Sequence, residues 1–392
     1  MLRSKKIQLL LALLLVFSLG LTGCAGNPEK EPAAEGETAQ TEKVEGEAEA
    51  SDMKILIVTS PSGVDDGSFN QDNYNGIQDF IATHAGASVN PVQEPTGDVN
   101  ASVQAVADAV AEYDVIVTPG FQFSGISSIA DANPDKKFIL VDAYPDPAGE
   151  KEVFDNVYAM QFAEEESGFL AGVAAALETK SGKVGVVNGI AFPSNVNYQF
   201  GFESGVNYAV KHLGATAEIV EIASYAGTDV TQANVGGNYV GSFADESTGK
   251  VVGEALIEQG VDVMLVAAGG SGNGVFTAAK EKGGVWIIGC DVDQYDDGTY
   301  SGGNVILTSV LKNMRINVER SLNRVVDGSF KGENALLKAD TDSTGYVSAE
   351  GRQQLQAETI KQLDEVYAKL KDGSIVPASN FNGHTPEEFP GL

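Results

Sequence analysis

The stretch KILIVTSPSGVDDGSFNQDNYNGIQDFIATHAGASVNPVQ, residues 54–93, contains the alternation that decides the fold. It opens with an apolar run at residues 54–60, which is typical of a strand buried on both faces. In residues 69–84 the apolar side chains recur at spacings of three and four, which indicates a helix. A second short strand is expected at residues 88–93. A strand, a helix and a strand in this order predict a parallel pair covered by a helix.

The same alternation continues along the chain and then starts again. We expect a helix at 101–112 and strands at 115–119 and 138–142. The second series has helices at residues 163–180, 195–213, 248–260 and 274–282, and strands at 183–188, 218–222, 263–268 and 286–291. The predicted fold class is therefore α/β, with two doubly wound, Rossmann-like lobes and a ligand cleft between them.

The boundaries of the two lobes follow from where the alternation is interrupted. The β-rich stretches at 157–162 and 305–312 have no helix immediately before them, and we expect crossovers between the lobes there. We assign residues 53–162 plus about 312–392 to an N-terminal lobe, and residues 163–311 to a C-terminal lobe. The carboxyl ends of the strands should then point into the cleft, which would close by a hinge motion.

The first residues have the features of a bacterial lipoprotein signal. Three basic residues precede an apolar run at 7–21, which ends in LTGC at residues 21–24. This pattern marks a secretory signal peptide, here residues 1–23, and the run is too short for a membrane-spanning helix. The ending resembles a lipobox, in which Cys24 would be diacylated and would anchor the chain outside the cytoplasmic membrane. An ordinary signal peptide and an uncleaved anchor are the alternatives.

Residues 24–52 are expected to form a disordered acidic tether behind the lipidated cysteine. The segment is rich in glutamate, has two lysines and lacks aromatic residues. It cannot bury enough apolar surface to offset the entropy of the chain, and its like charges extend it. A specific acidic interaction tail is the alternative.

Composition excludes several classes of function. A formal net charge of −30 argues against a nucleic-acid-binding protein, which needs a basic face. Of two cysteines, Cys24 is assigned to the lipid and Cys290 lies in an apolar run, so no intramolecular disulfide is expected. One spare cysteine and three histidines cannot build a zinc cluster. We expect no metal and no cofactor.

Polar and aromatic side chains gather where the expected strands end. Carboxylates accept hydrogen bonds from hydroxyl groups, and aromatic rings stack on flat rings or sugar faces. The set suits a neutral ligand with hydroxyl groups and a flat part, and it does not suit an anion. The candidate ligand-binding residues are Asp66, Ser68, Phe69, Asn70, Asp142, Tyr198, Phe202, Asp245, Gly269, Gly270, Asp291 and Lys312.

Simpler readings of these residues remain open at this point. Asp66 or Ser68 could cap the helix that begins near Phe69, with the ring packed in the protein. Tyr198 and Phe202 share one helical face, which is more often a core face. The glycine-rich loop at 269–274 resembles a phosphate cradle but lacks the Gly-Lys-Ser/Thr ending of a P-loop.

Enzymatic functions are disfavoured. The sequence has no G-x-S-x-G elbow, and no histidine pairs with a nucleophile. Paired acids could in principle cleave a glycosidic bond or bind a divalent ion. Acids at strand ends are also common in proteins that only bind, and we expect a binding protein without catalytic residues.

Several motifs in order along residues 53–326 resemble the basic membrane protein family. These are lipoprotein substrate-binding subunits of ABC transporters, related to the purine nucleoside receptor. The matching motifs are DDGSFNQ at 65–71, SGFLAG at 167–172, GFxxG at 201–205, GSFxD at 241–245, AGGxGxGV at 268–275, IGxDxDQ at 288–294 and LTSVxK at 307–312. The resemblance implies a type I periplasmic-binding-protein fold.

The resemblance also implies how a nucleoside would be held. The base would lie between two aromatic rings, one from each lobe: Phe69 and either Tyr198 or Phe202. Asp66 and Asn70 would hold the edge of the base.

The ribose would be held by Asp245, with the Gly270 backbone and Lys312 nearby. Asp142 and Asp291 would be further contacts in the cleft.

The partners implied by the resemblance are a nucleoside, an ABC permease and its ATPase, with the chain acting as a monomer. Two departures from the family pattern bear on the ligand: Tyr198 stands where phenylalanine is more usual, and the loop at 224–238 is longer than usual. The alternatives are therefore a receptor for another flat or hydroxylated solute such as riboflavin, or a surface sensor for such a ligand.

Overall fold

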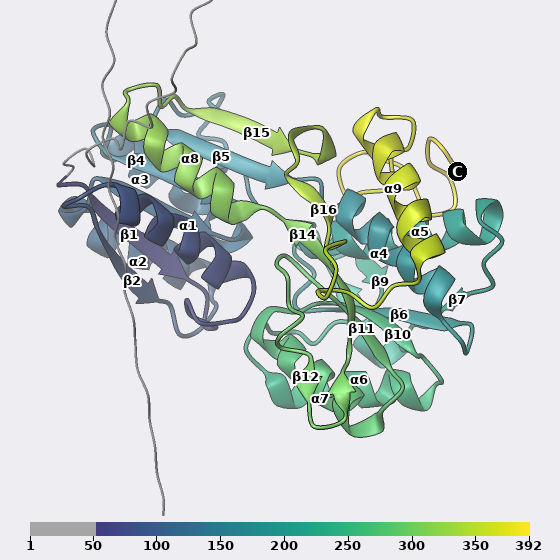
Figure 1. Cartoon of the computed structure of the whole chain (residues 1–392). Helices are drawn as coiled ribbons and strands as arrows, with labels where there is room; N and C mark the ends of the chain where they lie inside the picture. Colours follow the sequence, from purple (N-terminus) through teal and green to yellow (C-terminus); the bar gives the residue numbers. More distant parts are fainter. Residues whose placement is uncertain (1–51) are drawn as a thin grey trace, which may run out of the picture. The chain divides into compact units, whose positions relative to one another are not determined.

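A computed structural model describes residues 52–392 of the chain (Figure 1). The predictions for residues 1–23, for Cys24 and for most of the tether lie outside the described residues. The described part contains two six-stranded sheets with strand orders β15-β5-β4-β3-β1-β2 and β16-β14-β11-β10-β6-β7. The predicted two-lobed, doubly wound arrangement is therefore present. No helix among residues 52–392 is both long and apolar enough to cross a membrane.

The sheet of the N-terminal lobe is wholly parallel. Its four inner strands are apolar and largely buried because helices cover both faces, whereas the edge strands carry polar residues. The elements are β1 (Lys54–Thr59), α1 (Phe69–Thr83), β2 (Ser88–Gln93), α2 (Val99–Ala109), β3 (Val115–Pro119), the short helix η2 (Phe121–Ile126), α3 (Ser127–Ala132), β4 (Lys137–Val141), β5 (Val157–Phe162), α8 (Met314–Val326) and β15 (Glu333–Leu337). The side chains of α1 and α8 share one hydrophobic core with this sheet, and those of α2 and η2 share another.

The C-terminal lobe repeats this plan with one antiparallel edge, where β16 pairs with β14. Two short hairpins, β8-β9 and β12-β13, extend from it. The elements are α4 (Glu164–Glu178), β6 (Lys183–Asn188), α5 (Pro193–His212), β7 (Glu218–Ile219), β8 (Gly227–Thr228), β9 (Asn234–Gly236), α6 (Glu246–Glu258), β10 (Val263–Ala267), α7 (Gly272–Lys282), β11 (Trp286–Gly289), β12 (Thr299–Tyr300), β13 (Gly303–Asn304), β14 (Ile306–Lys312), β16 (Thr344–Tyr346) and α9 (Ala357–Lys371).

Glycines let the backbones of α4 and α5 approach closely. A Cβ atom on Gly172 would lie 2.0 Å from the carbonyl oxygen of Phe202, and one on Gly205 would lie 2.2 Å from that of Phe169. The two phenylalanine side chains are fully buried beside this contact. The SGFLAG and GFxxG motifs therefore serve helix packing, and a larger residue would push the helices apart.

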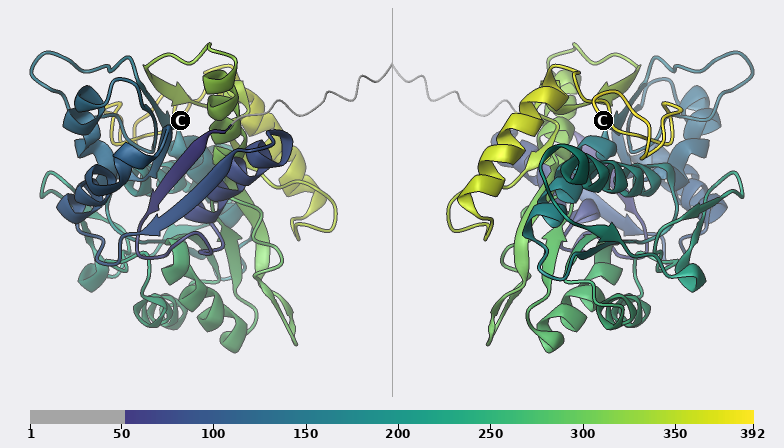
Figure 2. Two further views of the ribbon diagram at one scale, coloured as in Figure 1. Left: turned by 90° about the vertical axis from the view of Figure 1, so that its left-hand side faces the viewer. Right: turned by 90° about the vertical axis from the view of Figure 1, so that its right-hand side faces the viewer.

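The predicted extent of the N-terminal lobe is wrong after β15. Of the residues after 312, only those from α8 to β15 belong to that lobe. Strand β16 instead pairs with β14, and α9 contributes Leu363, Val366 and Leu370 to the core of the C-terminal lobe (Figures 1 and 2). An amphipathic C-terminal helix can cover either lobe, and its sequence pattern does not say which.

The two stretches expected as crossovers are strands inside the sheets. Residues 157–162 form β5 of the N-terminal lobe, and β14 belongs to the sheet of the C-terminal lobe. The chain passes between the lobes directly after each of them, and a third time between β15 and β16. The crossovers therefore lie at the carboxyl ends of the two β-rich stretches that the sequence indicated, and the stretches themselves are strands of the two sheets.

Candidate ligand-binding site

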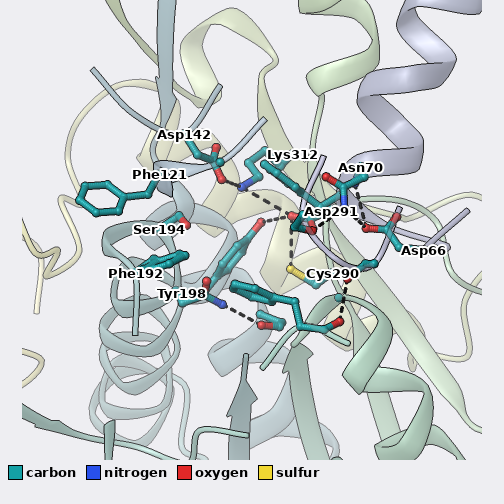
Figure 3. Close-up of a pocket in the computed structure, with 18 of the residues that line it drawn as sticks. Asp66, Asn70, Phe121, Asp142, Phe192, Ser194, Tyr198, Cys290, Asp291 and Lys312 are labelled. Atoms are coloured by element: carbon teal, nitrogen blue, oxygen red, sulfur yellow. Dashed lines mark hydrogen bonds and ion pairs between the residues drawn. The ribbon is translucent and has the colours of Figure 1, made fainter. Parts of the chain in front are cut away.

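A cavity lies between the lobes, at the carboxyl ends of the strands of both sheets (Figure 3). It encloses roughly 570 Å³ of space that protein atoms do not fill, part of it open to solvent. Its lining residues are Ser60, Ser62, Asp66, Phe69, Asn70, Gly120, Phe121, Gln122, Asp142, Phe192, Ser194, Asn195, Tyr198, Phe243, Ala267, Gly269, Cys290, Asp291 and Lys312.

Lys312 is the only cationic side chain among these lining residues, and three carboxylates surround it. Its Nζ lies 2.6 Å from Asp142 Oδ2, 3.5 Å from Glu164 Oε1 and 3.8 Å from Asp291 Oδ1. All four side chains are at least nine-tenths buried. Because β14 belongs to the C-terminal lobe and Asp142 to the N-terminal lobe, the shortest of these ion pairs joins the lobes.

Burial and mutual charge shift the pKa values in this group. Burial raises the pKa of Glu164 to about 8, with Lys312 opposing the shift. Burial also raises the pKa of Asp142, and again Lys312 opposes it. Burial acts to lower the pKa of Lys312, but Asp142, Asp291 and Glu164 outweigh it and raise that pKa. The three acidic groups therefore favour the charged form of Lys312, and burial favours the protonated form of Glu164.

Asp142 and Asp291 occupy equivalent places in the two lobes. Asp142 follows β4 and Asp291 follows β11 after one residue, and each of these strands is third in its sheet. Both have left-handed backbone conformations, with φ of 63° and 69°. Such conformations in residues other than glycine are uncommon and cluster at binding sites. Here each turns a carboxylate toward Lys312 (Figure 3).

Asp66 caps helix α1, although Ser68 occupies the N-cap position. The Asp66 carboxylate accepts hydrogen bonds from the backbone N–H groups of Ser68, Asn70 and Gln71, each at 3.0 Å. It also accepts from Asn70 Nδ2 at 3.0 Å. Burial raises the pKa of Asp66, and these backbone bonds oppose the shift. Asp66 thus has little capacity left for a ligand.

Two residues that line the cavity each have a buried acceptor atom without a hydrogen-bond partner within residues 52–392. The atoms are Asn70 Oδ1 and Asp142 Oδ1. The other polar atoms of these side chains are used: Asn70 Nδ2 donates to Ser60 and Asp66, and Asp142 Oδ2 accepts from Lys312. Leaving a buried polar atom unpaired costs about 1–3 kcal/mol. The cavity therefore favours a ligand that supplies hydrogen-bond donors.

Aromatic rings line both ends of the cavity. At the polar end, Lys312 Nζ lies 4.8 Å from the ring centroid of Phe69 and 5.6 Å from that of Tyr198. Phe69 comes from the N-terminal lobe and Tyr198 from the C-terminal lobe.

At the other end, the ring of Phe121 from the N-terminal lobe faces that of Phe192 at 5.4 Å between centroids. Phe192 in turn lies 6.0 Å from Phe243, which belongs to the same lobe. A flat ligand would therefore meet aromatic surface from both lobes.

The structure separates the predicted site residues into two groups. Those that line the cavity are Asp66, Phe69, Asn70, Asp142, Tyr198, Gly269, Asp291 and Lys312. Four others do not. Ser68 lies behind the cavity wall, Phe202 is fully buried in the core, Asp245 caps helix α6, and Gly270 lies beside the lining Gly269.

Of the two alternatives for the second stacking ring, only Tyr198 lies at the cavity. Asp245 accepts hydrogen bonds from Thr248 N at 3.0 Å and Thr248 Oγ1 at 2.6 Å, which lower its pKa.

Several residues that line the cavity, and Glu164 beside its lysine, were missed from the sequence. Glu164 stands in a run of three glutamates at the start of α4, which reads as an ordinary acidic first turn. Phe121, Phe192 and Phe243 lie in loops or short turns after strands, where no periodicity reveals which way a ring points. The available signals were the predicted strands shortly before Phe121 and Phe192, and the GSFxD motif that contains Phe243.

The buried ion pairs, unpartnered acceptors and aromatic rings of this cavity are suited to binding a polar, partly flat ligand. Cys290 lines the cavity, but burial raises its pKa well above the usual range, so the thiol is not activated. Within the described residues, no group of three or more histidine, cysteine or acidic side chains is placed to hold a metal ion.

Comparison with known families identifies the chain. The model of the family described as ABC transporter substrate-binding protein PnrA-like matches residues 53–221 and 223–380. The chain belongs to this family. The resemblance to basic membrane proteins stated from the motifs is thereby confirmed.

Curated relatives of this PnrA-like protein cover most of its length. A CD4+ T-cell-stimulating antigen of Listeria monocytogenes is 30% identical over 363 residues, which is 87% of this chain and 92% of the relative. Basic membrane protein A1 of Borrelia garinii is 30% identical, over 88% and 93% of the two chains. The ABC transporter nucleoside-binding protein BmpA of Lactococcus lactis is 29% identical, over 72% and 77%.

Solved structures agree on the fold of the PnrA-like chain. An ABC transporter solute-binding protein from Aeropyrum pernix superposes with a TM-score of 0.68 at 23% identity, covering 84% of this chain and 94% of the other. A second, from Conexibacter woesei, has a TM-score of 0.59 at 18% identity, with 83% and 99% covered. The predicted type I periplasmic-binding-protein fold is confirmed.

Proposed function

We propose that this chain binds a nucleoside, with a preference for purines, and delivers it as a monomer to a membrane permease driven by an ATPase. The observation that carries the proposal is the pair of unpartnered acceptors, Asn70 Oδ1 and Asp142 Oδ1, beside aromatic rings from both lobes. A nucleoside has the complementary groups: a flat base, N–H donors and ribose hydroxyls. The Lactococcus lactis relative is named a nucleoside-binding protein, which supports this ligand class.

In the proposed complex the base lies between Phe69 and Tyr198. Asn70 Oδ1 and Asp142 Oδ1 accept hydrogen bonds from the ligand, and Lys312 donates one. Pairing these buried acceptors recovers about 1–3 kcal/mol for each. The ligand leaves unchanged, because the proposal involves binding without catalysis.

We also propose that Cys24 carries lipid and that residues 24–52 tether the receptor outside the cytoplasmic membrane. The support is the LTGC sequence after a short apolar run, followed by an acidic segment without aromatic residues. A Cys24→Ser variant should leave the membrane fraction while its ligand affinity stays that of the wild type. Retention of this variant in the membrane would contradict the lipid anchor.

The ligand class is tested by thermal unfolding with a panel of compounds. Adenosine, guanosine and inosine are compared with cytidine, uridine, the free purine bases, riboflavin and simple sugars. A ligand at 100 times its dissociation constant stabilises the fold by roughly 2.7 kcal/mol. Stabilisation by a purine nucleoside supports the proposal. Stabilisation by riboflavin or a sugar alone, or by none of the compounds, would reject it.

A further inference from the structure

One loop of the N-terminal lobe makes hydrogen bonds to the opposite lobe through two serine side chains, and its Gly67 carbonyl oxygen accepts a longer one, of 3.4 Å, from Gln294 Nε2. The Ser68 hydroxyl also lies 3.4 Å from the carbonyl oxygen of Cys290. The loop follows β1, at residues 60–68. Ser62 Oγ donates to the carbonyl oxygen of Phe243 at 2.9 Å, and Ser68 Oγ donates to Asp291 Oδ2 at 3.0 Å. Phe243 and Asp291 both line the ligand cavity. Each serine therefore contacts, across the lobe interface, a residue that forms the cavity wall.

The hydroxyl of Ser68 is available because Asp66, and not Ser68, caps helix α1. A serine at an N-cap position normally accepts a hydrogen bond from the first turn of its helix. Ser68 makes no such bond, because Asp66 accepts from the N–H groups of that turn. The hydroxyl of Ser68 is therefore free to donate to the other lobe. The side chain is buried there, at 4% exposure.

The bond from Ser68 completes the surroundings of Asp291. Asp291 Oδ1 accepts from the hydroxyl of Tyr198 at 3.0 Å, within the C-terminal lobe. Asp291 Oδ2 accepts from Ser68, in the N-terminal lobe. The orientation of this carboxylate therefore depends on contact with both lobes, and opening of the cleft removes one of its two hydroxyl partners.

Phe243 is fixed by contacts within its own lobe, independently of its bond to Ser62. Its carbonyl oxygen also accepts from Ser271 N at 3.0 Å. Its ring lies against Gly189, where a Cβ atom would come within 2.2 Å of the ring. Because Phe243 is fixed in its lobe, the bond from Ser62 restricts how the two lobes can move relative to each other.

We infer that Ser62 and Ser68 are positioning residues that hold the lobes closed and keep Asp291 and Phe243 in place around the ligand. Their effect is on the closed state, so they slow ligand release and leave ligand entry into the open cleft unchanged. The inference rests on the proposed function only for the choice of ligand.

The experiment compares Ser62→Ala, Ser68→Ala and the double variant with the wild type, in full-length chain carrying Cys24→Ser. Stopped-flow measurements with a purine nucleoside give the association and dissociation rates. Ser321→Ala is the matched control, because its buried hydroxyl donates to Asn317 O at 2.7 Å within α8 of one lobe. Ser68→Thr keeps a hydroxyl and tests for rescue.

The distance between the lobes is measured in the same proteins. Fluorescent dyes on cysteines introduced at Gln104 of α2 and Lys282 of α7, both exposed, report energy transfer with and without ligand. Cys290 is buried and stays unlabelled. This measurement needs no ligand, so it tests the closure contacts even if no nucleoside binds.

Each serine variant should release ligand roughly three to ten times faster, the size expected for one buried hydrogen bond. Its association rate should stay within about twofold of the wild type, and the closed population should fall. Ser68→Thr should restore slow release, and Ser321→Ala should change neither rate. Unchanged release and unchanged energy transfer in the double variant would overturn the inference, as would equal effects in Ser321→Ala.

Discussion

Asp142 and Asp291 end equivalent strands of the two lobes, and their carboxylates lie 2.6 Å and 3.8 Å from the same atom, Lys312 Nζ. The left-handed backbone of each aspartate turns its side chain toward the lysine. One cation thus joins the two halves of the cavity at its polar end. The predictions below test what this group and its neighbours contribute.

Replacing Lys312 with methionine should destabilise the fold by about 3–5 kcal/mol, because it leaves buried carboxylates without their cation. The loss should be smaller at pH 5 than at pH 8. A buried carboxyl whose folded pKa is raised stabilises the fold at low pH, and that contribution disappears as pH rises through the folded value. Urea unfolding at both pH values measures this, with exposed Lys282→Met as the control. An equal loss at both pH values would contradict the prediction.

Replacing Glu164 with glutamine should flatten the dependence of stability on pH. Burial raises the pKa of Glu164 from 4.5 to about 8, so the folded state holds a proton that the unfolded state loses. Its contribution is complete below pH 4.5 and is lost as pH rises to about 8, at up to roughly 1.4 kcal/mol per pH unit. Glutamine keeps an oxygen that can accept the hydrogen bond which Asn197 Nδ2 donates to Glu164 Oε2 at 3.0 Å. The unfolding free energies of the two proteins, measured at pH 5, 6.5 and 8, should therefore be similar at pH 5 and should diverge as pH rises. The slopes decide the matter: parallel curves for the two proteins would mean that Glu164 is ionised.

Phe69→Ala should weaken nucleoside binding by about 1–3 kcal/mol, the range for an aromatic ring stacked on a base. Phe202→Leu should lower the free energy of unfolding and leave affinity nearly unchanged, because Phe202 is fully buried in the core. Isothermal titration calorimetry and urea unfolding on both variants separate the two roles. Loss of affinity in Phe202→Leu, at temperatures where it is fully folded, would be inconsistent with this assignment.

Asp245→Ala should reduce stability by about 0.5–2 kcal/mol, the usual effect of losing an N-cap. Asp245 accepts from Thr248 at the start of α6 and does not line the cavity. Affinity for nucleosides should therefore change little. Calorimetry measures both affinities. A loss of affinity for nucleosides without a loss for free bases would contradict this assignment and would support the contact between Asp245 and ribose that was expected from the sequence.

The architecture could be predicted from the sequence because buried parallel strands and amphipathic helices have distinct periodicities. The alternation of residues 54–93 already specified the β-α-β unit, and the strand ends located Asp142 and Asp291. The C-terminal portion was misplaced because the pattern of α9 shows that one face is buried but does not show against which lobe.

The site was predictable where a residue follows directly from a strand, and less so where side-chain direction decides. Tyr198 and Phe202 are four residues apart on one face of α5, yet one lines the cavity and the other packs in the core. Asp66 accepts hydrogen bonds from the first N–H groups of helix α1. The hydroxyl of Ser68 can therefore donate to the other lobe. The different roles of such neighbouring residues depend on differences of a few ångströms in side-chain position. The spacing of residues along the sequence does not reveal these differences.

The return of α8 and β15 to the N-terminal lobe has a consequence for how the chain folds. Met314, Val318 and Leu322 of α8 are fully buried in the core that this lobe builds from residues 53–162. A ribosome must therefore add about 150 further residues before α8 can complete the cover that α1 begins on that face of the sheet. Such distant contacts slow folding, and the N-terminal lobe cannot be completed until most of the C-terminal lobe has been synthesised.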